Sequence, residues 1–265
     1  MLRSILLLTV LAFLGLAPIE AAETTRFELR TEVVTYRQGE TELEGVLVYN
    51  GAQTGRRPAV LVVHQWLGLS DYERKRAEML AELGYAAFCA DIYGKGVRPA
   101  NPGEAGALAG RYKNDRGLLR ARVQAALDTM KQQGVVDPTK TAAVGYCFGG
   151  TTVLELARAG ADTRGVVSFH GGLASPTTGR PGGIKAAILA LHGADDPFVP
   201  PAEVAGFEDE MRQAKADWQL VAYGGAVHSF TDWNATGAMT GAKYDEKADR
   251  RSWAAMKQFL DELFH

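Results

Sequence analysis

One cysteine in a glycine-rich turn is the clearest sign of chemistry in this sequence. Cys147 stands in the run Gly-Tyr-Cys-Phe-Gly-Gly at residues 145–150, directly after the apolar run 141–145. At a sharp turn between a strand and a helix, a thiol is lifted above the sheet as a nucleophile, and small residues are needed where backbone segments crowd together. The alternative is a glycine-rich strand end with a buried cysteine. The turn therefore predicts a nucleophile only if its partners are also present.

An aspartate pair and a histidine follow later apolar runs in the order that a catalytic triad requires. Asp195 and Asp196 come after the run 187–192, and His228 comes after Trp218–Tyr223. In open α/β sheets with a nucleophile at such a strand–helix turn, the chain order is nucleophile, acid, histidine. The functional sites of these sheets lie past the carboxyl ends of the strands. Taken singly, an Asp-Asp-Pro stretch is a turn and a lone histidine is a loop residue. Together they favour a Cys-His-Asp triad.

The elements that would position these residues alternate between short apolar strands and helices. A Gln-Gly-Glu turn at 38–40 lies between two β-branched, aromatic segments, which predicts an opening antiparallel hairpin. The expected strands are 31–36, 41–49, 59–63, 86–90, 141–145, 165–169, 187–192 and 218–223, with a glycine- and proline-rich loop at 93–110. Helices are expected from Ser70, near 118–131, after Cys147, from about Pro201 and over 244–264. This alternation predicts one α/β domain with a mostly parallel sheet and helices on both faces.

Several stretches together resemble the dienelactone hydrolase family of α/β-hydrolases, over essentially the whole chain after its first 22 residues. They are residues 63–68, 85–94, 145–150, 196–200 and 228–230. The resemblance implies that Cys147 is the nucleophile, His228 the base and Asp196 its partner, which leaves Asp195 as a neighbour. It also implies that the backbone N–H groups of Trp66 and Phe148 form an oxyanion hole.

Two departures from the family pattern concern the substrate. The family's enzymes for anionic dienelactones carry a glutamate where this sequence has Gln65, and an arginine where it has Thr231 and Asp232. Lys95 and Arg98 lie in the loop where the family places another arginine that grips a substrate carboxylate; the alternative for both is solvated loop charge. Gln65, Lys95 and Arg98 are therefore the candidates for binding substrate or tuning the thiol. An uncharged Gln65 lacks the carboxylate that would raise the pKa of a nearby thiol.

Composition and charge exclude several classes of function. The chain has 29 basic and 31 acidic side chains, a net charge of −2, and no long block of like charge. We therefore expect no nucleic-acid partner and a small-molecule substrate. The histidines show no metal-ligand spacing with carboxylates or cysteines, so we expect neither a metal nor another cofactor.

The first 22 residues have the pattern of a secretory signal peptide. Arg3 precedes an almost uncharged run from Ile5 to Ile19, and small residues follow. Such a run is too short to favour a stable membrane span, and the alternative is an uncleaved N-terminal anchor. We expect cleavage near residue 22, a hydrolase domain over 23–265, a secreted or periplasmic protein, and no stable membrane insertion after the signal is removed. In an oxidising compartment Cys89 and Cys147 could pair; the alternative is that Cys89 is a buried strand residue.

The sequence therefore predicts an exported carboxylic ester hydrolase that cleaves a small ester or lactone through a thioacyl-enzyme. Two other functions use the same scaffold. One is a small-molecule binding protein that has lost turnover, suggested by the missing glutamate at Gln65. The other is a thiol redox protein, suggested by export. Neither function needs a base oriented by an acid.

Overall fold

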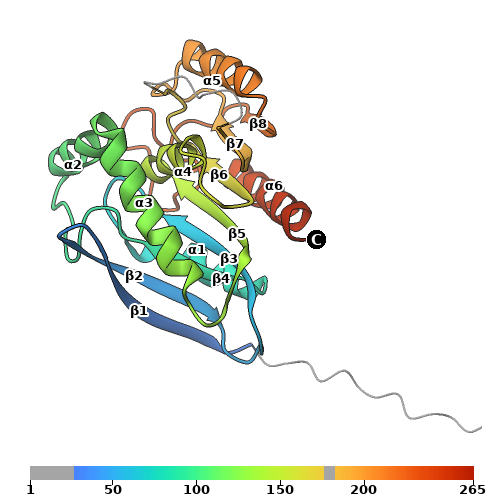
Figure 1. Ribbon diagram of the computed structural model, residues 1–265. Helices are drawn as coiled ribbons and strands as arrows, with labels where there is room; N and C mark the ends of the chain where they lie inside the picture. Colours follow the sequence, from blue (N-terminus) through green and yellow to red (C-terminus); the bar gives the residue numbers. More distant parts are fainter. Residues whose placement is uncertain (1–26, 176–182) are drawn as a thin grey trace, which may run out of the picture.

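The computed structural model describes residues 27–175 and 183–265, which build a sheet of eight strands with helices on both faces (Figure 1). The expected signal peptide, residues 1–22, lies outside the described residues. Within the described part of the chain, no helix is both long enough and apolar enough to cross a membrane.

The sheet begins with an antiparallel hairpin and continues as a parallel sheet. Its strands are β1 (Leu29–Gln38), β2 (Thr41–Asn50), β3 (Arg57–Val63), β4 (Ala86–Ala90), β5 (Val136–Tyr146), β6 (Gly165–Phe169), β7 (Ala187–Gly193) and β8 (Trp218–Tyr223). They lie in the order β1-β2-β4-β3-β5-β6-β7-β8, where β1 pairs antiparallel with β2, β2 antiparallel with β4, and the others parallel. The predicted fold class, with its N-terminal hairpin, is confirmed.

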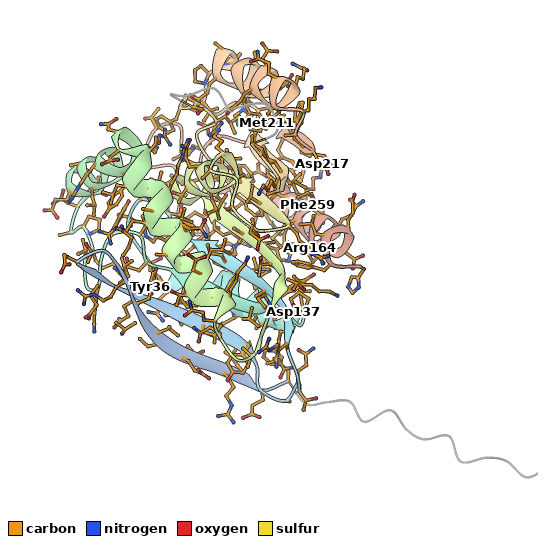
Figure 2. The ribbon with its side chains drawn as sticks, viewed as in Figure 1. Tyr36, Asp137, Arg164, Met211, Asp217 and Phe259 are labelled. Carbon is orange, nitrogen blue, oxygen red and sulfur yellow. The ribbon has the colours of Figure 1, made fainter. Side chains whose placement is uncertain are left out.

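Helices cover the two faces of the sheet as two separate apolar layers. The helices are α1 (Asp71–Glu82), α2 (Pro102–Asn114), α3 (Arg116–Lys131), α4 (Phe148–Arg158), α5 (Pro201–Ala214) and α6 (Glu246–Phe264). Side chains of a strand alternate between faces, so Leu61 joins one layer and Val62 the other. Figure 1 shows α3 in front of the sheet and α1 behind it. Figure 2 labels Met211 of α5, in the layer of Leu61, and Phe259 of α6, in the layer of Val62.

Helix α2 begins inside the segment 93–110 that the sequence predicted as a loop and continues to Asn114, so this part of the prediction was wrong. The start of the helix has a clear local signal: the Asn101 side chain caps it by accepting the N–H of Glu104, and Pro102 is its first residue. Three glycines lower the helix propensity of the segment, at positions 103, 106 and 110. Burial of Ala105 and Tyr112 outweighs that cost.

The turn from β5 into α4 depends on glycines because backbone meets backbone there. A Cβ atom on Gly145 would lie 2.0 Å from the carbonyl oxygen of Gly149, and one on Gly149 would lie 2.2 Å from that of Val63. The first turn of α4 thus rests directly on the ends of β3 and β5. This contact fixes the height at which Cys147 stands above the sheet.

We predict that Gly149→Ala destabilises the protein because its methyl group would overlap the Val63 carbonyl and no flexible side chain could yield. Overpacking of this kind costs about 1–3 kcal/mol, so the thermal unfolding midpoint should fall by several degrees. Gly206→Ala is the matched control: it lies in α5 with nothing within 4 Å of its Cβ, and alanine should stabilise that helix by about 0.5–1 kcal/mol. Equal midpoints for the two variants would contradict the close contact.

Candidate active site

Cys147 occupies a strained turn between β5 and α4. Its backbone angles are φ 54° and ψ −111°, outside the region that non-glycine residues normally adopt. Of the four non-glycine residues with positive φ in the described chain, Cys147, His170 and Ser229 lie at this site, and Lys215 ends α5. Each such conformation costs about 1–3 kcal/mol and persists only where the surrounding structure enforces it. Strain is thus concentrated around the thiol.

The structure brings Cys147, His228 and Asp196 together in hydrogen-bonding contact. His228 Nε2 lies 3.0 Å from Cys147 Sγ, and His228 Nδ1 lies 2.8 Å from Asp196 Oδ2. The other oxygen of Asp196 accepts the N–H of Phe198 at 2.9 Å. Asp195 is exposed, and its own N–H is bonded to Ala226 O at 3.0 Å. Of the two neighbouring aspartates, only Asp196 therefore meets the histidine.

The electrostatics of the contact favour a thiolate paired with an imidazolium. Burial raises the pKa of the Cys147 thiol, but the charge and hydrogen bond of His228, the charge of Lys113 and the N–H of Phe148 outweigh burial and lower it. Burial likewise lowers the pKa of His228, while the sulfur and Asp196 raise it to about 10. Each partner stabilises the charged form of the other. The Cys147 thiol therefore ionises more readily than an ordinary buried thiol.

The backbone around Trp66 is fixed next to the end of β3. His64 Nε2 accepts the N–H of Ile92 at 3.2 Å, so Nδ1 carries the ring proton and donates to Gln65 O at 2.6 Å. Burial lowers the pKa of His64 to about 4, which keeps the ring neutral. The hydroxyl of Tyr93 donates to Trp66 O at 3.0 Å. Residues 65 and 66 thus have their peptide groups held in place.

Gln65 is buried, and its side chain is bonded to Asp232. Its Nε2 donates to Asp232 Oδ2 at 3.1 Å, and its backbone N–H donates to Glu73 Oε1 at 3.0 Å. The position where the family carries a glutamate therefore presents an amide that is bonded to a carboxylate. The Gln65–Asp232 pair carries one negative charge and no positive charge.

Lys95 and Arg98 contact residues outside the triad. Lys95 Nζ pairs with Glu42 at 2.9 Å and lies 3.7 Å from Glu44, at an exposed position. Arg98 Nε donates to Leu69 O at 2.8 Å, in the loop that leads into α1. These contacts link the 93–98 loop to β2 and to the segment before α1.

A small cavity beside the triad carries basic side chains that sequence reasoning did not identify. It has a volume of about 180 Å³ and is lined by Lys113, Arg116, Thr151, Gly172, Ala174, Phe198 and Glu203. The Phe198 ring stands edge-on to His228, with 5.3 Å between the ring centroids. Arg116 Nη1 lies 3.8 Å from Glu155, and the buried Nε and Nη1 atoms have no hydrogen-bond partner in the described structure. The guanidinium thus has unused hydrogen-bonding capacity beside this cavity.

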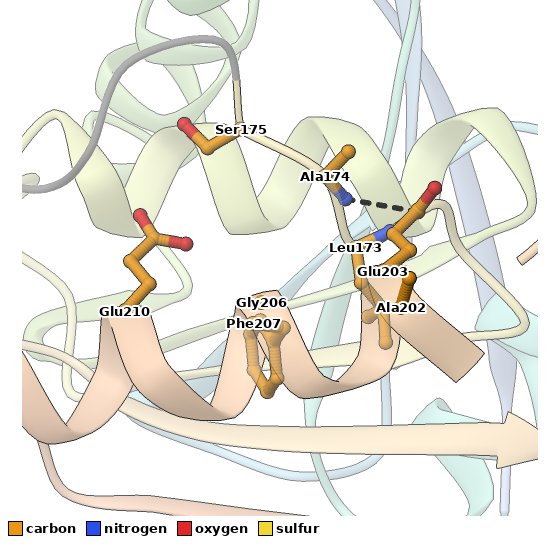
Figure 3. Close-up of a pocket in the computed structure, with 8 residues that line it drawn as sticks. All are labelled: Leu173, Ala174, Ser175, Ala202, Glu203, Gly206, Phe207 and Glu210. Atoms are coloured by element: carbon orange, nitrogen blue, oxygen red, sulfur yellow. Dashed lines mark hydrogen bonds between the residues drawn. The ribbon is translucent and has the colours of Figure 1, made fainter. Parts of the chain in front are cut away.

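A larger neighbouring cavity shares two residues with this one but contains no triad residue. It has a volume of about 440 Å³ and lies between α5 and the segment after β6 (Figure 3). Glu203 borders both cavities, and its Oε1 accepts the N–H of Ala174 at 2.9 Å, the bond drawn as a dashed line in Figure 3. That bond ties Glu203 of α5 to the segment after β6. The smaller cavity lies next to the triad through Phe198, whose ring contacts His228.

Sequence reasoning also missed His170, which contacts the nucleophile directly. Its Nδ1 lies 3.1 Å from the backbone N of Cys147. The residue follows the carboxyl end of β6, so the rule that identified Asp196 and His228 could have found it. Lys113 and Arg116 had no such signal, because helices near any surface carry basic residues.

The second cysteine lies apart from the site. Cys89 is buried in β4, its Sγ donates to Glu73 O at 3.4 Å, and both cysteines are free thiols. Among the residues that the structure describes, no three His, Cys, Asp or Glu side chains converge as a possible metal site.

The sheet order, the strained turn after β5 and the residues past β7 and β8 define the class of the protein as an α/β-hydrolase. The sequence matches the dienelactone hydrolase family over residues 43–264. The chain belongs to this family of carboxylic ester hydrolases.

Individual relatives support the assignment. The crystal structure of a dienelactone hydrolase-like promiscuous phosphotriesterase from metagenomic libraries is 41% identical, with a TM-score of 0.86, and the match covers 89% of this chain and 99% of that one. A Bradyrhizobium protein named as a probable 2-oxo-3-(5-oxofuran-2-ylidene)propanoate lactonase is 32% identical over 67% of this chain and 75% of its own length. A putative carboxymethylenebutenolidase of Synechocystis is 24% identical over 88% of this chain and 97% of its own.

Proposed function

We propose that the protein hydrolyses a small ester or lactone through a thioacyl-enzyme on Cys147. The observation that carries the proposal is the continuous contact from Cys147 Sγ through His228 to Asp196. The names of the lactonase and carboxymethylenebutenolidase relatives support the same substrate class. Each of these groups has one task in the proposed reaction.

The first half of the reaction uses the charges that are already present. The Cys147 thiolate attacks the carbonyl carbon, a C–S bond forms, and the carbonyl oxygen becomes negative. The His228 imidazolium then gives its Nε2 proton to the leaving alkoxide, and the C–O bond breaks. Asp196 stabilises the imidazolium and orients its ring without taking the proton. An acylated thiol and a neutral histidine remain.

Water completes the cycle. Neutral His228 removes a proton from water, the resulting hydroxide attacks the thioester, and the C–S bond breaks to release the acid. The proton stays on His228, so the thiolate–imidazolium pair is restored. For an intramolecular ester such as a lactone, the alkoxide and the acyl group belong to one molecule.

The negative carbonyl oxygen needs donors that are fixed before the reaction. Phe148 N–H is one, because it is the first amide of α4 and already stabilises the thiolate. As charge moves from sulfur to oxygen, this donor remains beside it. Trp66 N–H is the second, since the Tyr93 and His64 bonds hold its peptide segment in place. Two such donors contribute a few kcal/mol to lowering the barrier.

The alternative functions explain the geometry less well. A binding protein without turnover does not need His228 to contact both a sulfur and a carboxylate. A dithiol redox function needs a second accessible thiol. Cys89 is buried in β4, and burial raises the pKa of its thiol.

We predict that Cys147→Ala and His228→Ala each lower kcat on a panel of small esters and lactones by about a thousandfold or more, because each removes a group that bonds to substrate or carries its proton. Asp196→Asn should have a smaller but still large effect, since the acid only orients and stabilises. The wild-type rate should rise as the thiolate forms and fall as pH passes through the His228 pKa of about 10, because the acid form is then lost.

Asp195→Asn is the matched control for Asp196→Asn. Asp195 is adjacent in sequence but exposed, so its kcat should stay within about twofold of the wild type. Reversed effects of the two aspartates, or full activity of Cys147→Ala, would reject the proposed triad.

The cavity next to the triad favours a small substrate that carries an anionic group. Its volume is about 180 Å³, and Lys113 and Arg116 are among the residues that line it. Glu203 also lines it, but that carboxylate already accepts backbone N–H groups. A carboxylate on the substrate would supply the acceptor that Arg116 lacks.

We predict that Arg116→Gln lowers kcat/KM for a half-ester of a dicarboxylic acid by about 10- to 100-fold, the worth of a hydrogen bond to a charged group. A neutral ester of the same length should lose little. Arg212→Gln, an exposed arginine on α5 paired with Glu208 and Asp209, serves as the control and should change neither substrate. Equal losses in kcat/KM on the charged and the neutral ester would show that Arg116 does not bind the substrate's anionic group.

Export remains part of the proposal, with residues 1–22 as a cleaved signal peptide and a secreted or periplasmic mature protein. The support is the single basic residue, the short apolar run and the small residues that follow. We predict that protein recovered from the periplasmic or secreted fraction begins near Ala22 or Glu23, as read by intact mass. A chain that retains Met1 and stays in membranes would contradict export.

A further inference from the structure

The ring of His170 bridges the nucleophile turn and a buried polar network. The residue follows β6 and is fully buried. Its Nδ1 faces the backbone N–H of Cys147 at 3.1 Å, and its Nε2 lies 2.7 Å from Thr231 Oγ1. An amide can only donate, so Nδ1 must be the unprotonated nitrogen, and Nε2 carries the hydrogen that it donates to Thr231.

The far end of this network is anchored to a buried ion pair. Thr231 Oγ1 lies 2.7 Å from the Tyr72 hydroxyl, which accepts the Nε–H of Arg76 at 3.2 Å. Arg76 in turn bonds Asp249 at 2.6 Å and also donates to Thr231 O at 2.8 Å. The His170 ring is therefore fixed on its Nε2 side by a hydrogen-bonded chain that runs through Thr231 and Tyr72 to Arg76.

The surroundings oppose protonation of His170. Burial, the His228 charge and the Arg76 charge all lower its pKa well below the ordinary value. The His228 ring is 5.3 Å away, between centroids, and the Tyr146 and Phe230 rings contribute apolar walls. A proton on Nδ1 would also point at the N–H of Cys147, donor against donor. The ring stays neutral beside a histidine that changes charge.

Strain in the backbone points to the same residue. His170 has φ 40° and Cys147 φ 54°, and a side-chain hydrogen bond joins them. The Cys147 N–H also donates to Phe169 O at 3.0 Å, so the amide would keep one partner if the His170 bond were lost. The His170 bond is thus not needed to satisfy the amide. What it adds is a fixed direction for the turn.

We propose that His170 is a positioning residue for the nucleophile: its neutral ring, anchored through Thr231, holds the Cys147 turn so that the sulfur stays between His228 Nε2 and the first N–H of α4. The inference rests on the proposed function of Cys147. It assigns the two neighbouring histidines different tasks. His228 carries the proton, and His170 keeps a constant acceptor on the strained amide through every step.

The test compares two amides of different reach. In His170→Asn the side-chain oxygen can take the place of Nδ1 and accept from Cys147, and asparagine tolerates positive φ. In His170→Gln the longer side chain reaches the place of Nε2 and Thr231 instead. Two readouts are used on the purified protein: kcat and KM on an ester, and the rate of Cys147 alkylation by iodoacetamide against pH. The Cys147→Ala variant gives the alkylation background.

A misplaced reacting group costs up to about 100-fold, so we expect His170→Gln to lose about 10- to 100-fold in kcat with KM within about threefold. Its alkylation midpoint should move up toward the free-thiol value of about 8.5, because the sulfur moves away from His228 and the Phe148 N–H, two of the groups that lower its pKa. His170→Asn should recover most of both. Thr231→Val should resemble the glutamine variant, and Thr231→Ser should restore the wild-type behaviour.

Several outcomes would overturn the proposal. One is that His170→Gln has the wild-type kcat and the wild-type alkylation midpoint. Another is that His170→Asn and His170→Gln have the same kcat and the same alkylation midpoint. If His170→Gln fails to fold, as judged by its thermal unfolding, the Thr231→Val and Thr231→Ser pair decides the question. The alkylation profile needs no turnover. A wild type that hydrolyses no ester would therefore reject the proposed function while the thiol profiles still test the role of His170.

Discussion

The contact between Cys147 Sγ and His228 Nε2 is the interaction on which the rest of the site depends. It joins residues 81 positions apart at a distance of 3.0 Å. That distance requires β5, β7 and β8 to end at one edge of the sheet, which the parallel registers ensure. It also requires α4 to approach the sheet closely, which is possible because Gly149 has no side chain. The parallel strand ends and the close approach of α4 thus together fix the position and direction of the Cys147 sulfur.

Charge at the site is stabilised by protein groups that are fixed in place. Burial alone would raise the thiol pKa and lower that of His228, so both residues would be neutral. The ion pair exists because each partner supplies the opposite charge, and because the first amide of α4 faces the sulfur. His64 and His170 border the same region and are neutral, each with one nitrogen accepting a backbone N–H. Such neutral rings can support the backbone without competing for the proton.

The strands and the contact among Cys147, His228 and Asp196 could be predicted because both follow local rules. Apolar runs separated by helices identify a parallel sheet, and residues past the strand ends are candidates for the site. Helix α2 could not be predicted with the same ease, because its glycines weaken the local signal and burial of Tyr112 restores the helix. That two side-chain nitrogens of Arg116 have no hydrogen-bond partner could not be predicted from the sequence either. Whether a basic side chain has a partner depends on residues distant in sequence, here Glu155 of α4.

The Gln65–Asp232 pair is the part of the site that departs from the pattern that the sequence resemblance implies. That pattern has a glutamate and an arginine at these positions, whereas here an amide donates to a carboxylate at 3.1 Å. This pair brings no positive charge to its side of the site. Lys113 of α2 and Arg116 of α3 supply positive charge at the cavity that Phe198 lines, and the Phe198 ring contacts His228. Lys113 also lowers the thiol pKa, although its effect is smaller than that of His228. A substrate anion seated in this cavity would therefore meet a charge that also contributes to lowering the thiol pKa.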